Sequence, residues 1–324
     1  MGRLAERSAL VTGAGRGIGR AVAMLLASEG ASVVVNDPGV NVDGTGHDAG
    51  PADQVVDEIT AAGGKAVANY DSVAELDGGE AMVKQCADAF GRIDILVNVA
   101  GILRDRMIFN MSEEEWDAVI AVHLNGHFNT IKPASVLMRQ QRFGRIVNFS
   151  SISGLRGNSG QGNYGAAKAG VAGLTRVVAR DLGRYGVTCN AIAPGALTRM
   201  TAAVPESARQ LRASRGMNQP GGGSTQRIVE PSAEHVAPMT VYLCTDRAWD
   251  INGKIFHVAG GSIALAAEEA PVRQISRAGQ AGQGDSWDVA ELISLVPTQL
   301  LADIPNPAPP PPDLDLPGRP AQAG

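Results

Sequence analysis

A tyrosine and a lysine stand four residues apart, Tyr164 and Lys168, within a segment of helical pattern at Gly162–Tyr185. Residues at positions i and i+4 project from the same face of a helix, so the phenol and the ammonium would lie side by side. A free tyrosine has a pKa of about 10, and a neighbouring cation favours the phenolate. The pair therefore suits a general acid–base acting on an alcohol, although the same spacing also occurs on ordinary solvated helices.

Ser151 follows an apolar run, Arg145–Ser150, that has the pattern of a buried strand. In a parallel sheet, the end of a strand and the start of the next helix meet at the carboxyl edge, where ligands bind. A hydroxyl there could hold a substrate oxygen beside Tyr164. The alternative is an ordinary strand-end serine, and Ser150 and Ser153 keep that alternative open.

A glycine-rich loop, Thr12–Gly19, follows the first apolar run and opens a helical segment. Glycines let the backbone approach a pyrophosphate, and the amino end of a helix offers free N–H groups to it. The spacing is TGxxxGxG and does not fit GxGxxG, because Ile18 stands where a third glycine would be needed. The loop predicts a dinucleotide site, and the alternative is a tight glycine-rich turn.

Asp37 ends the second apolar run and bears on the choice of dinucleotide. A carboxylate at this point can accept hydrogen bonds from the adenosine ribose, and it would repel a 2′-phosphate. Arg16 is the opposing signal, since a basic side chain in the loop could pair with that phosphate. We expect NAD rather than NADP, and the alternative for Asp37 is a turn or loop cap.

The elements that must position these residues alternate strand and helix. The expected strands are nearly continuous in apolar character, as in strands buried on both faces of a parallel sheet, and lie at 8–12, 32–36, 65–70, 93–98, 145–150, 187–192 and 254–258. Helical patterns fall between them at 17–28, 52–62, 78–90, 112–141, 162–185 and 232–243. This alternation predicts an α/β fold, a Rossmann-type doubly wound domain with a seven-stranded parallel sheet.

Two features of the segment 112–141 refine its expected helix. Ser112 and Glu115 form a capping box that would open it, and Pro133 predicts a kink or break inside it.

The expected catalytic domain is 1–262, and a loop at 199–231 would overhang its carboxyl edge as a substrate lid. The remainder, 263–324, is an expected C-terminal extension with one short helix at 286–296. Its proline-rich stretch, Pro305–Pro320, is expected to be extended or disordered, and a PxxP partner site is the alternative.

Composition narrows the class of protein. Lys and Arg number 28 and Asp and Glu 33, a net charge of −5, so a nucleic-acid partner is not expected. No apolar run reaches the length of a membrane span, and the start lacks a secretory signal pattern. Three scattered cysteines suit a reducing compartment, and a cytoplasmic location is expected.

His123 and His127 share the i, i+4 spacing of two zinc ligands on a helix. No glutamate follows His123 as HExxH requires, and the sequence suggests no third ligand. We therefore predict no metal.

These motifs, in this order, resemble the short-chain dehydrogenase/reductase family over about residues 5–262: Thr12–Gly19, Asn98–Gly101, Asn125, Ser151, Tyr164–Lys168 and Pro194-Gly195. The resemblance implies that Tyr164 is the general acid–base, Lys168 lowers its pKa and binds ribose, and Ser151 positions the substrate oxygen. Asn125 would hold a water that links Lys168 to solvent. It also implies a cofactor site made of Gly13, Arg16, Gly17, Ile18, Gly19, Asn98, Ala100, Gly101, Tyr164, Lys168, Pro194 and Gly195. The expected threonine after Pro194-Gly195 comes one place early, at Thr198.

Further segments are similar to the (R)-3-hydroxyacyl-CoA dehydrogenase units of peroxisomal multifunctional enzymes and their bacterial stand-alone relatives: 34–37, 66–73, 101–106 and 116–128. In that group Asp71 would bind the adenine amino group with Ser72 beside it. The implied substrate is a 3-hydroxyacyl-CoA, and a steroid or other bulky secondary alcohol is the alternative. A homodimer or homotetramer through 112–141 and 162–185 is implied.

Two other classes of function stay open. One is a dinucleotide-binding protein without turnover, against which the presence of every catalytic position argues. The other is an interaction protein that works through the proline-rich tail.

Overall fold

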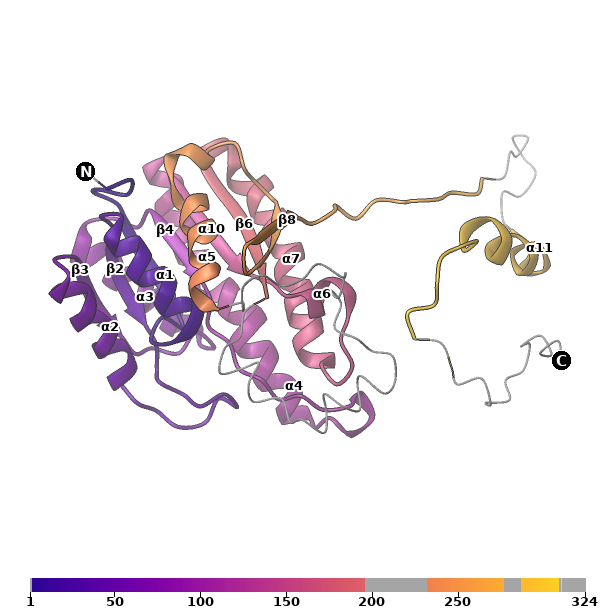
Figure 1. The fold of residues 1–324 in the computed structure, drawn as a ribbon, viewed down its shortest axis with the longest axis horizontal. Helices are drawn as coiled ribbons and strands as arrows, with labels where there is room; N and C mark the ends of the chain where they lie inside the picture. Colours follow the sequence, from indigo (N-terminus) through magenta and orange to yellow (C-terminus); the bar gives the residue numbers. More distant parts are fainter. Residues whose placement is uncertain (1, 196–231, 277–286, 309, 311–324) are drawn as a thin grey trace. The chain divides into compact units, whose positions relative to one another are not determined.

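The computed structural model describes residues 2–195, 232–276, 287–308 and 310. One sheet has the strand order β3-β2-β1-β4-β5-β6-β7-β8 (Figure 1). The first seven strands are parallel, as predicted: β1 (Ser8–Thr12), β2 (Ser32–Asn36), β3 (Lys65–Asn69), β4 (Ile95–Asn98), β5 (Gly144–Phe149), β6 (Val187–Pro194) and β7 (Ile255–Ala259). Every residue of β1, β4 and β5 is buried, which explains their unbroken apolar pattern.

The prediction of seven strands was wrong by one. β8 (Ser262–Leu265) pairs antiparallel with β7, so the sheet has eight strands. Only Gly260 and Gly261 separate β7 from β8, which is enough for a hairpin but far too short for a parallel crossover. All four residues of β8 are exposed, so it lacks the buried pattern by which the other strands were found.

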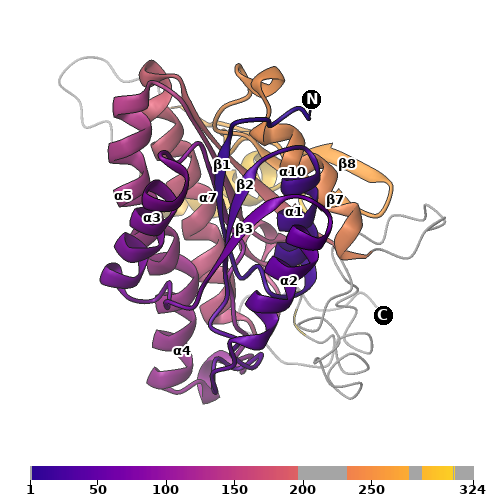
Figure 2. The ribbon, with the colours of Figure 1, turned by 90° about the vertical axis from the view of Figure 1, so that its left-hand side faces the viewer.

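Helices cover both faces of the sheet (Figure 2). On one face, α1 (Gly17–Ser28), α2 (Gly50–Ala61) and α10 (Ala237–Cys244) pack against inward side chains such as Val11 and Val33. On the other, α3 (Leu76–Phe90), α5 (Gly126–Gln141) and α7 (Gly162–Leu182) pack against Leu10 and Val34. The doubly wound α/β layering is therefore confirmed.

The segment 112–141 breaks at a different place from the one predicted. It divides into α4 (Glu113–Ile120), one π-helical turn η2 (Ala121–Asn125) and α5, whereas Pro133 lies inside α5. Because Pro133 has no N–H, the carbonyl of Asn129, four residues earlier, lacks its usual helical hydrogen bond. Gly79 of α3 packs directly against that carbonyl, and a Cβ at Gly79 would collide with it. The predicted capping box is present, with the Glu115 amide donating to Ser112 Oγ at 3.2 Å.

Shorter elements complete the first unit: η1 (Ile108–Asn110), α6 (Ile152–Arg156), η3 (Gly183–Tyr185), η4 (Ala233–His235) and η5 (Asp246–Ala248). The chain divides into units 1–266 and 267–324, so the first unit includes β8 and extends beyond the predicted boundary at 262. In the second unit, α11 (Val289–Leu295) and η6 (Val296–Leu300) lie where a short helix was predicted. The predicted lid at 199–231, Thr198 and most of Pro305–Pro320 lie outside the described residues.

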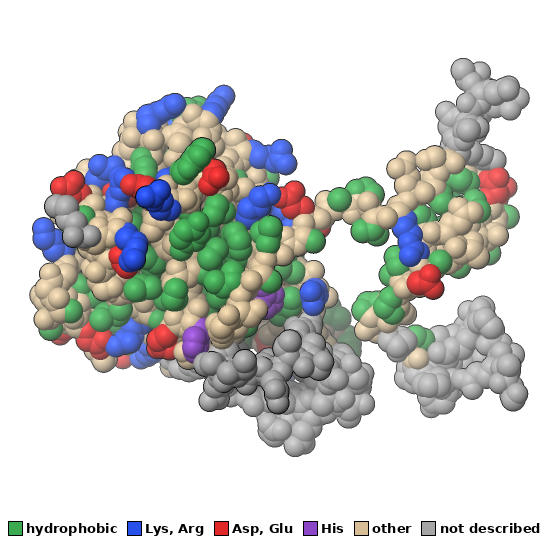
Figure 3. Space-filling view, turned by 45° about the horizontal axis from the view of Figure 1, so that its top comes forward, with side chains coloured by type: hydrophobic (Ala, Val, Ile, Leu, Met, Phe, Trp, Pro, Cys, Tyr) green, Lys and Arg blue, Asp and Glu red, His purple; other side chains and the backbone are tan. Residues whose placement is uncertain are grey.

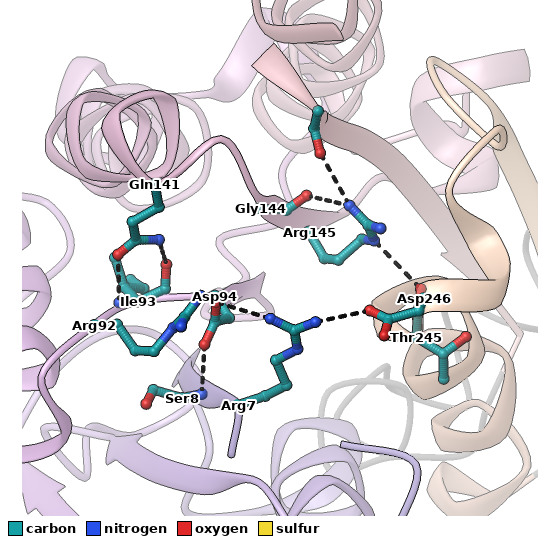
Figure 4. A network of polar contacts seen from close by, with 11 residues as sticks. Arg7, Ser8, Arg92, Ile93, Asp94, Gln141, Gly144, Arg145, Thr245 and Asp246 are labelled. Carbon is teal, nitrogen blue, oxygen red and sulfur yellow. Dashed lines mark hydrogen bonds and ion pairs between the residues drawn. The ribbon is translucent and has the colours of Figure 1, made fainter. Parts of the chain in front are cut away.

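A polar network joins the amino ends of the central strands (Figure 4). Asp94, fully buried before β4, accepts from the Ser8 amide at 3.1 Å and pairs with Arg92 at 2.6 Å and Arg7 at 3.6 Å. Buried Arg145 donates to main-chain carbonyls, among them Gly186 O at 3.2 Å. This network therefore ties strand starts together at the edge opposite to the predicted site.

None of the helices in the described part of the chain is long and apolar enough to cross a bilayer.

Candidate active site

The predicted site residues gather where the strands end. β1 lies between β2 and β4, so the chain adds strands first on one side of β1 and then on the other. In open α/β sheets, ligands bind outside the carboxyl ends of the strands at such a switch point. The glycine loop follows β1 there, Asp37 follows β2, Asn98–Gly101 follows β4 and Ser151 follows β5.

The glycines of the loop serve two purposes. Gly13 has φ +63°, and a Cβ on it would lie 2.8 Å from Ala100 Cα, so Gly13 allows two loops to touch. A Cβ on Gly19 would collide with the Gly13 carbonyl, so Gly19 allows α1 to pack against the loop. Gly17 differs, because it has φ +54° and nothing lies within 4 Å of its Cβ position.

The start of α1 lacks a cap. Arg16 is its N-cap residue and makes no side-chain cap, and the first turn holds no acidic residue. The first N–H groups of a helix need partners and carry partial positive charge. Together with the open backbone at Gly17, this start fits the phosphates of a dinucleotide. Ile18 is partly buried and packs against the hydrophobic core.

Asp37 holds the loop as well as facing the predicted ribose site. Its Oδ2 accepts from the Gly15 amide at 2.9 Å and its Oδ1 from the Gly39 amide at 2.7 Å. The loop-cap role that the sequence left open is thus present. A carboxylate has about four lone-pair positions, so capacity for ribose hydroxyls remains. Arg16 is exposed and lies 3.8 Å from Asp48, a carboxylate that competes for it.

Asp71 and Ser72 lie just beyond β3, beside the end of β2. Asp71 Oδ2 accepts from Asn69 Nδ2 at 2.7 Å, and Asn36 Nδ2 donates to the Asp71 carbonyl at 2.9 Å. Ser72 is exposed, and its hydroxyl accepts from the Ala74 amide at 3.2 Å. Both residues therefore lie at the edge where the adenine end of a dinucleotide was predicted.

Asn98 points into the protein. Its Oδ1 accepts from Thr130 at 2.8 Å, and its Nδ2 donates to Asn148 at 3.1 Å, so it links β4 to α5 and β5. The two residues that follow Asn98 are also fixed: the amides of Val99 and Ala100 donate to Thr12 Oγ1 at 3.1 Å and 3.3 Å. These bonds fix the turn 98–101 against the glycine loop.

Pro194 ends β6, and Gly195 continues its register. The Gly195 amide donates to Val258 O at 2.8 Å, and a Cβ on Gly195 would lie 2.8 Å from Ala259 Cβ. Both residues therefore stay close to β7 at the carboxyl edge.

Ser151, Tyr164 and Lys168 come together. The Ser151 side chain hydrogen-bonds the Tyr164 phenol, and Lys168 Nζ lies 5.6 Å from the centre of the Tyr164 ring. Lys168 Nζ donates to Phe149 O at 2.6 Å, which holds it at the end of β5. Of the alternatives, Ser150 donates to the Lys168 carbonyl at 2.9 Å and Ser153 to Gln161 at 2.8 Å, so both have structural partners.

Burial dominates the electrostatics of this cluster. Burial raises the pKa of Tyr164 to about 12, although the hydrogen bond with Ser151 opposes that rise. Burial also lowers the pKa of Lys168 to about 7. The charge of Asp105 contributes to the raised pKa of Tyr164. When nothing else is bound, the phenol is therefore neutral near pH 7 and the amine is close to the pH at which it loses its charge, and a bound cation or a substrate would change that balance.

Asn125 does not lie with these three residues, because its residue is exposed at the end of η2. His123, from the same turn, is buried and packs edge-on against Tyr164 with ring centres 5.1 Å apart. The relay role of Asn125 stays a prediction, and the geometry favours His123 for that place.

Other residues at the site escaped the sequence analysis because their roles depend on distant partners. Asn163 donates to Arg104 O at 2.9 Å and to Glu115 O at 2.8 Å, and accepts from the Tyr164 amide. Gln161 donates to Asp105 at 2.9 Å. Within the described residues, no group of three or more His, Cys, Asp or Glu is placed to hold a metal.

Comparisons with known proteins agree with this geometry. A family model described as short chain dehydrogenase matches residues 7–209. The hydroxyacyl-CoA dehydrogenase ChsB1 of Mycobacterium tuberculosis is 42% identical over 304 residues, which are 90% of this chain and 87% of that protein. The peroxisomal multifunctional enzyme type 2 of Mus musculus is 44% identical over 263 residues, 81% of this chain but 32% of that enzyme. A crystal structure of a short chain dehydrogenase from Mycobacterium avium is 45% identical with a TM-score of 0.74, covering 96% of this chain and 98% of that one.

Proposed function

Because this chain belongs to the short-chain dehydrogenase/reductase family and is an oxidoreductase acting on CH–OH groups, we propose that it is an NAD-dependent 3-hydroxyacyl-CoA dehydrogenase. The family resemblance inferred from the motifs is confirmed. The observation that carries the proposed reaction is the cluster of Ser151, Tyr164 and Lys168 beside the open glycine loop. The similarity to a hydroxyacyl-CoA dehydrogenase over 304 residues supports the substrate class.

Each residue of the cluster has one task in the proposed reaction. Tyr164 accepts the proton of the substrate hydroxyl as the carbonyl forms, and donates it back in the reverse direction. The Ser151 hydroxyl hydrogen-bonds the same substrate oxygen and fixes its position. NAD, when bound, supplies the acceptor for the hydride that leaves the carbinol carbon.

Lys168 makes Tyr164 competent. The pKa of Tyr164 is raised to about 12 by burial, too high for a base near neutral pH. A charged ammonium beside the ring, together with the positive charge of an oxidised nicotinamide, favours the phenolate and lowers this pKa. The carbonyl of Phe149 holds the Lys168 ammonium in place by accepting its hydrogen bond.

Asp37 supports NAD over NADP. Its two oxygens are fixed by the amides of Gly15 and Gly39, so the carboxylate stays at the end of β2. A 2′-phosphate placed there would meet a like charge. The opposing signal, Arg16, is weakened by its ion pair with Asp48 at 3.8 Å.

A spectrophotometric screen tests this function. NAD and NADP are each assayed at 340 nm with (R)- and (S)-3-hydroxyacyl-CoAs, hydroxysteroids and simple secondary alcohols. We expect NAD with a 3-hydroxyacyl-CoA to give the highest kcat/KM. A preference for NADP would contradict the role of Asp37, and a preference for steroids would favour the alternative substrate class.

The Tyr164→Phe variant separates an enzyme from a binding protein without turnover. Removing the proton acceptor should lower kcat by about 10²- to 10⁴-fold while NAD still binds. Equal turnover in Tyr164→Phe would rule out the mechanism. An interaction function of the tail predicts instead that truncation after about Gly284 abolishes the biological function yet spares NAD reduction.

We also propose a homodimer or homotetramer that forms through α4, α5 and α7, as the family resemblance implies. Exposed apolar side chains on these helices support it: Trp116, Phe128, Val136 and Val177. Figure 3 shows hydrophobic side chains gathered between charged ones on the face that it draws. Trp249, Ile263 and Leu265 are also exposed. Sedimentation equilibrium measures the assembly directly.

A further inference from the structure

The connection between β2 and α2 is long. It runs over residues 38–49, whereas a strand and the next helix of an α/β unit are typically joined by about 2–6 residues. Its two ends lie together, because the Asp48 amide donates to Pro38 O at 3.1 Å and a Cβ on Gly39 would collide with the Asp48 carbonyl. Compact surface loops whose ends meet in this way are frequently functional. The length of this β2–α2 loop therefore indicates a role beyond joining two elements.

The tip of the β2–α2 loop is a defined turn. The Asn41 amide donates to Thr45 O at 2.7 Å, and the Gly44 amide donates to Asn41 O at 3.0 Å. The Thr45 hydroxyl and amide both donate to Asp43 Oδ1, at 2.7 Å and 3.0 Å. Gly44 and Gly46 have φ values of +88° and +80°, which other residues adopt only with strain. The tip is therefore held in one shape by its own hydrogen bonds.

The tip lies against the loop that follows β4. The Leu103 amide donates to Val42 O at 2.8 Å. Gly44 faces Ile102, because a Cβ on Gly44 would lie 3.0 Å from Ile102 Cδ1. Ile102 is buried, so this part of the contact is apolar. The tip therefore covers the residue that directly follows the turn 98–101.

Arg104 joins the tip to the elements that carry the catalytic cluster. Its Nε donates to Asp43 O at 2.9 Å, and its Nη1 donates to Glu114 O, in the first turn of α4, at 3.3 Å. Its own carbonyl accepts from Asn163 of α7 at 2.9 Å. One half-buried guanidinium therefore bridges the β2–α2 loop and α4, next to the residue that precedes Tyr164.

The β2–α2 loop crosses the predicted dinucleotide site. β1 lies between β2 and β4, so a segment that leaves β2 and contacts the loop after β4 passes the carboxyl end of β1, where the glycine loop begins. On its way back the segment lies beside the glycine loop again, with Asp48 3.8 Å from Arg16. Figure 1 shows the β2–α2 loop extending from the sheet toward α4. A dinucleotide held by the glycine loop would therefore have the β2–α2 loop across its path to solvent.

We propose that the β2–α2 loop is a strap that retains the bound dinucleotide, and that Arg104 is the positioning residue that latches its tip. This inference rests on the proposed dinucleotide-dependent function. The latch consists of two hydrogen bonds, from the Leu103 amide and from Arg104, to the carbonyls of Val42 and Asp43. Both must break before the tip can leave Ile102. Because the Arg104 donor is charged, its bond is the stronger of the two, and it sets how long the dinucleotide stays bound.

The first test measures how fast NADH leaves the full chain, by stopped-flow fluorescence after mixing with excess NAD. Arg104→Gln removes the charge and shortens the side chain. We expect the dissociation rate constant of NADH to rise about tenfold, because the loss of a charged hydrogen bond destabilises the closed strap. Arg104→Lys keeps a charge and a donor but not the planar fork, so the rise should be less than about threefold.

The matched control is Arg106→Gln. Arg106 belongs to the same loop and also reaches α4, but its guanidinium pairs with Glu115 at 2.6 Å. An exposed ion pair contributes little, so NADH should leave Arg106→Gln within about twofold of the parent rate. An equal rate in Arg104→Gln and the parent, or an equal rise in Arg104→Gln and Arg106→Gln, overturns the latch. A parent chain that binds neither NADH nor NADPH contradicts the proposed function itself.

A second test locks the strap and does not depend on Arg104. A Cβ on Gly44 would lie 3.9 Å from Ile102 Cβ, a separation that suits a disulfide. The three native cysteines are buried, so oxidation of the double variant Gly44→Cys, Ile102→Cys is selective. Oxidation with NADH bound should slow its release at least about tenfold, and oxidation before NADH is added should slow its binding. Reduction with dithiothreitol should restore both rates.

The double variant is its own control. Comparing its oxidised and reduced forms removes the strain of a cysteine at φ +88° from the result. Thiol titration reports the extent of cross-linking. Equally fast release in both forms would show that the dinucleotide does not pass the strap. A pair that never cross-links would show that the tip does not lie on Ile102, and either result overturns the proposal.

Discussion

At the scale of single residues, burial sets the chemistry of the site. The same loss of solvent raises the pKa of Tyr164 to about 12, lowers that of Lys168 to about 7 and lowers that of His127 to about 3. All three groups are therefore held neutral near pH 7 or close to the point of losing their charge. Catalysis needs a partly ionised phenol, so charge must be supplied by what binds at the site.

The buried histidines predict acid sensitivity. Burial lowers the pKa of His127 to about 3 and that of His123 well below 6.5, whereas both rise to about 6.5 in the unfolded chain. Between these values the unfolded state binds more protons, so the free energy of unfolding falls as the pH falls. We expect at least about 2 kcal/mol per pH unit between pH 6 and 5, measured by urea denaturation.

His127→Asn supplies the control for this prediction. In this variant, folding excludes one proton fewer than in the parent protein. The slope of the free energy of unfolding against pH should therefore fall by about 1.4 kcal/mol per pH unit, whatever the absolute stability becomes. An unchanged slope in His127→Asn would contradict the buried neutral state of His127.

At the scale of elements, the amino end of α7 decides where Tyr164 lies. Asn163 is fully buried and bonds the loop carbonyl of Arg104 and the carbonyl of Glu115 at the start of α4. α6 also packs closely against α7, because a Cβ on Gly154 of α6 would lie 2.5 Å from the Ala169 amide nitrogen of α7. Tyr164 is thus held by two neighbouring elements rather than by its own helix alone.

Asn163→Ala should weaken both folding and catalysis. The change leaves two carbonyls and the Tyr164 amide without their partner, and should cost on the order of 3 kcal/mol in the free energy of unfolding. A shift of the helix start also misplaces the phenol, so kcat should fall more than KM changes. Asn163→Asp keeps the acceptor for the Tyr164 amide, but it sets a buried carboxylate oxygen against two carbonyl oxygens and should be at least as damaging as Asn163→Ala. Equal kcat in all three proteins would show that this anchor is dispensable.

At the scale of the whole molecule, the two edges of the sheet have separate tasks. The carboxyl edge holds the glycine loop and the Ser151–Tyr164–Lys168 cluster. The amino edge holds the Asp94 network, which joins the starts of β1, β4 and β5 (Figure 4). There two guanidinium groups also lie over the Phe143 ring, that of Arg7 at 3.8 Å and that of Arg145 at 4.5 Å from the ring centre.

Asp94→Asn should therefore lower stability and spare activity. Breaking a fully buried ion pair typically costs about 3–5 kcal/mol, but Arg7 and Arg92 are partly exposed, so we expect about 2–3 kcal/mol. Chemical denaturation measures the loss, and kcat/KM at 15 °C should stay within twofold of the parent. A large fall in kcat/KM for folded Asp94→Asn would show that the two edges are coupled.

The sequence by itself was enough for the α/β class, the seven parallel strands and the clustering of Ser151, Tyr164 and Lys168. Buried parallel strands have continuous apolar runs, and the order of strand and helix places their ends at one edge. The sequence was also enough for the glycine loop, because backbone positions with positive φ or a close neighbour require glycine, and glycines are visible in the sequence.

Only the tertiary structure decided the rest. The exposed hairpin strand β8 has no buried pattern to reveal it, and the π-helical turn depends on how η2 packs against α7, so His123 rather than Asn125 came to lie beside Tyr164. Asn163, Asp94 and the double role of Asp37 depend on partners far away in the chain. Periodicity records which face of an element is buried, but not which distant polar atom meets it there, and that pairing is what sets the charges of this site.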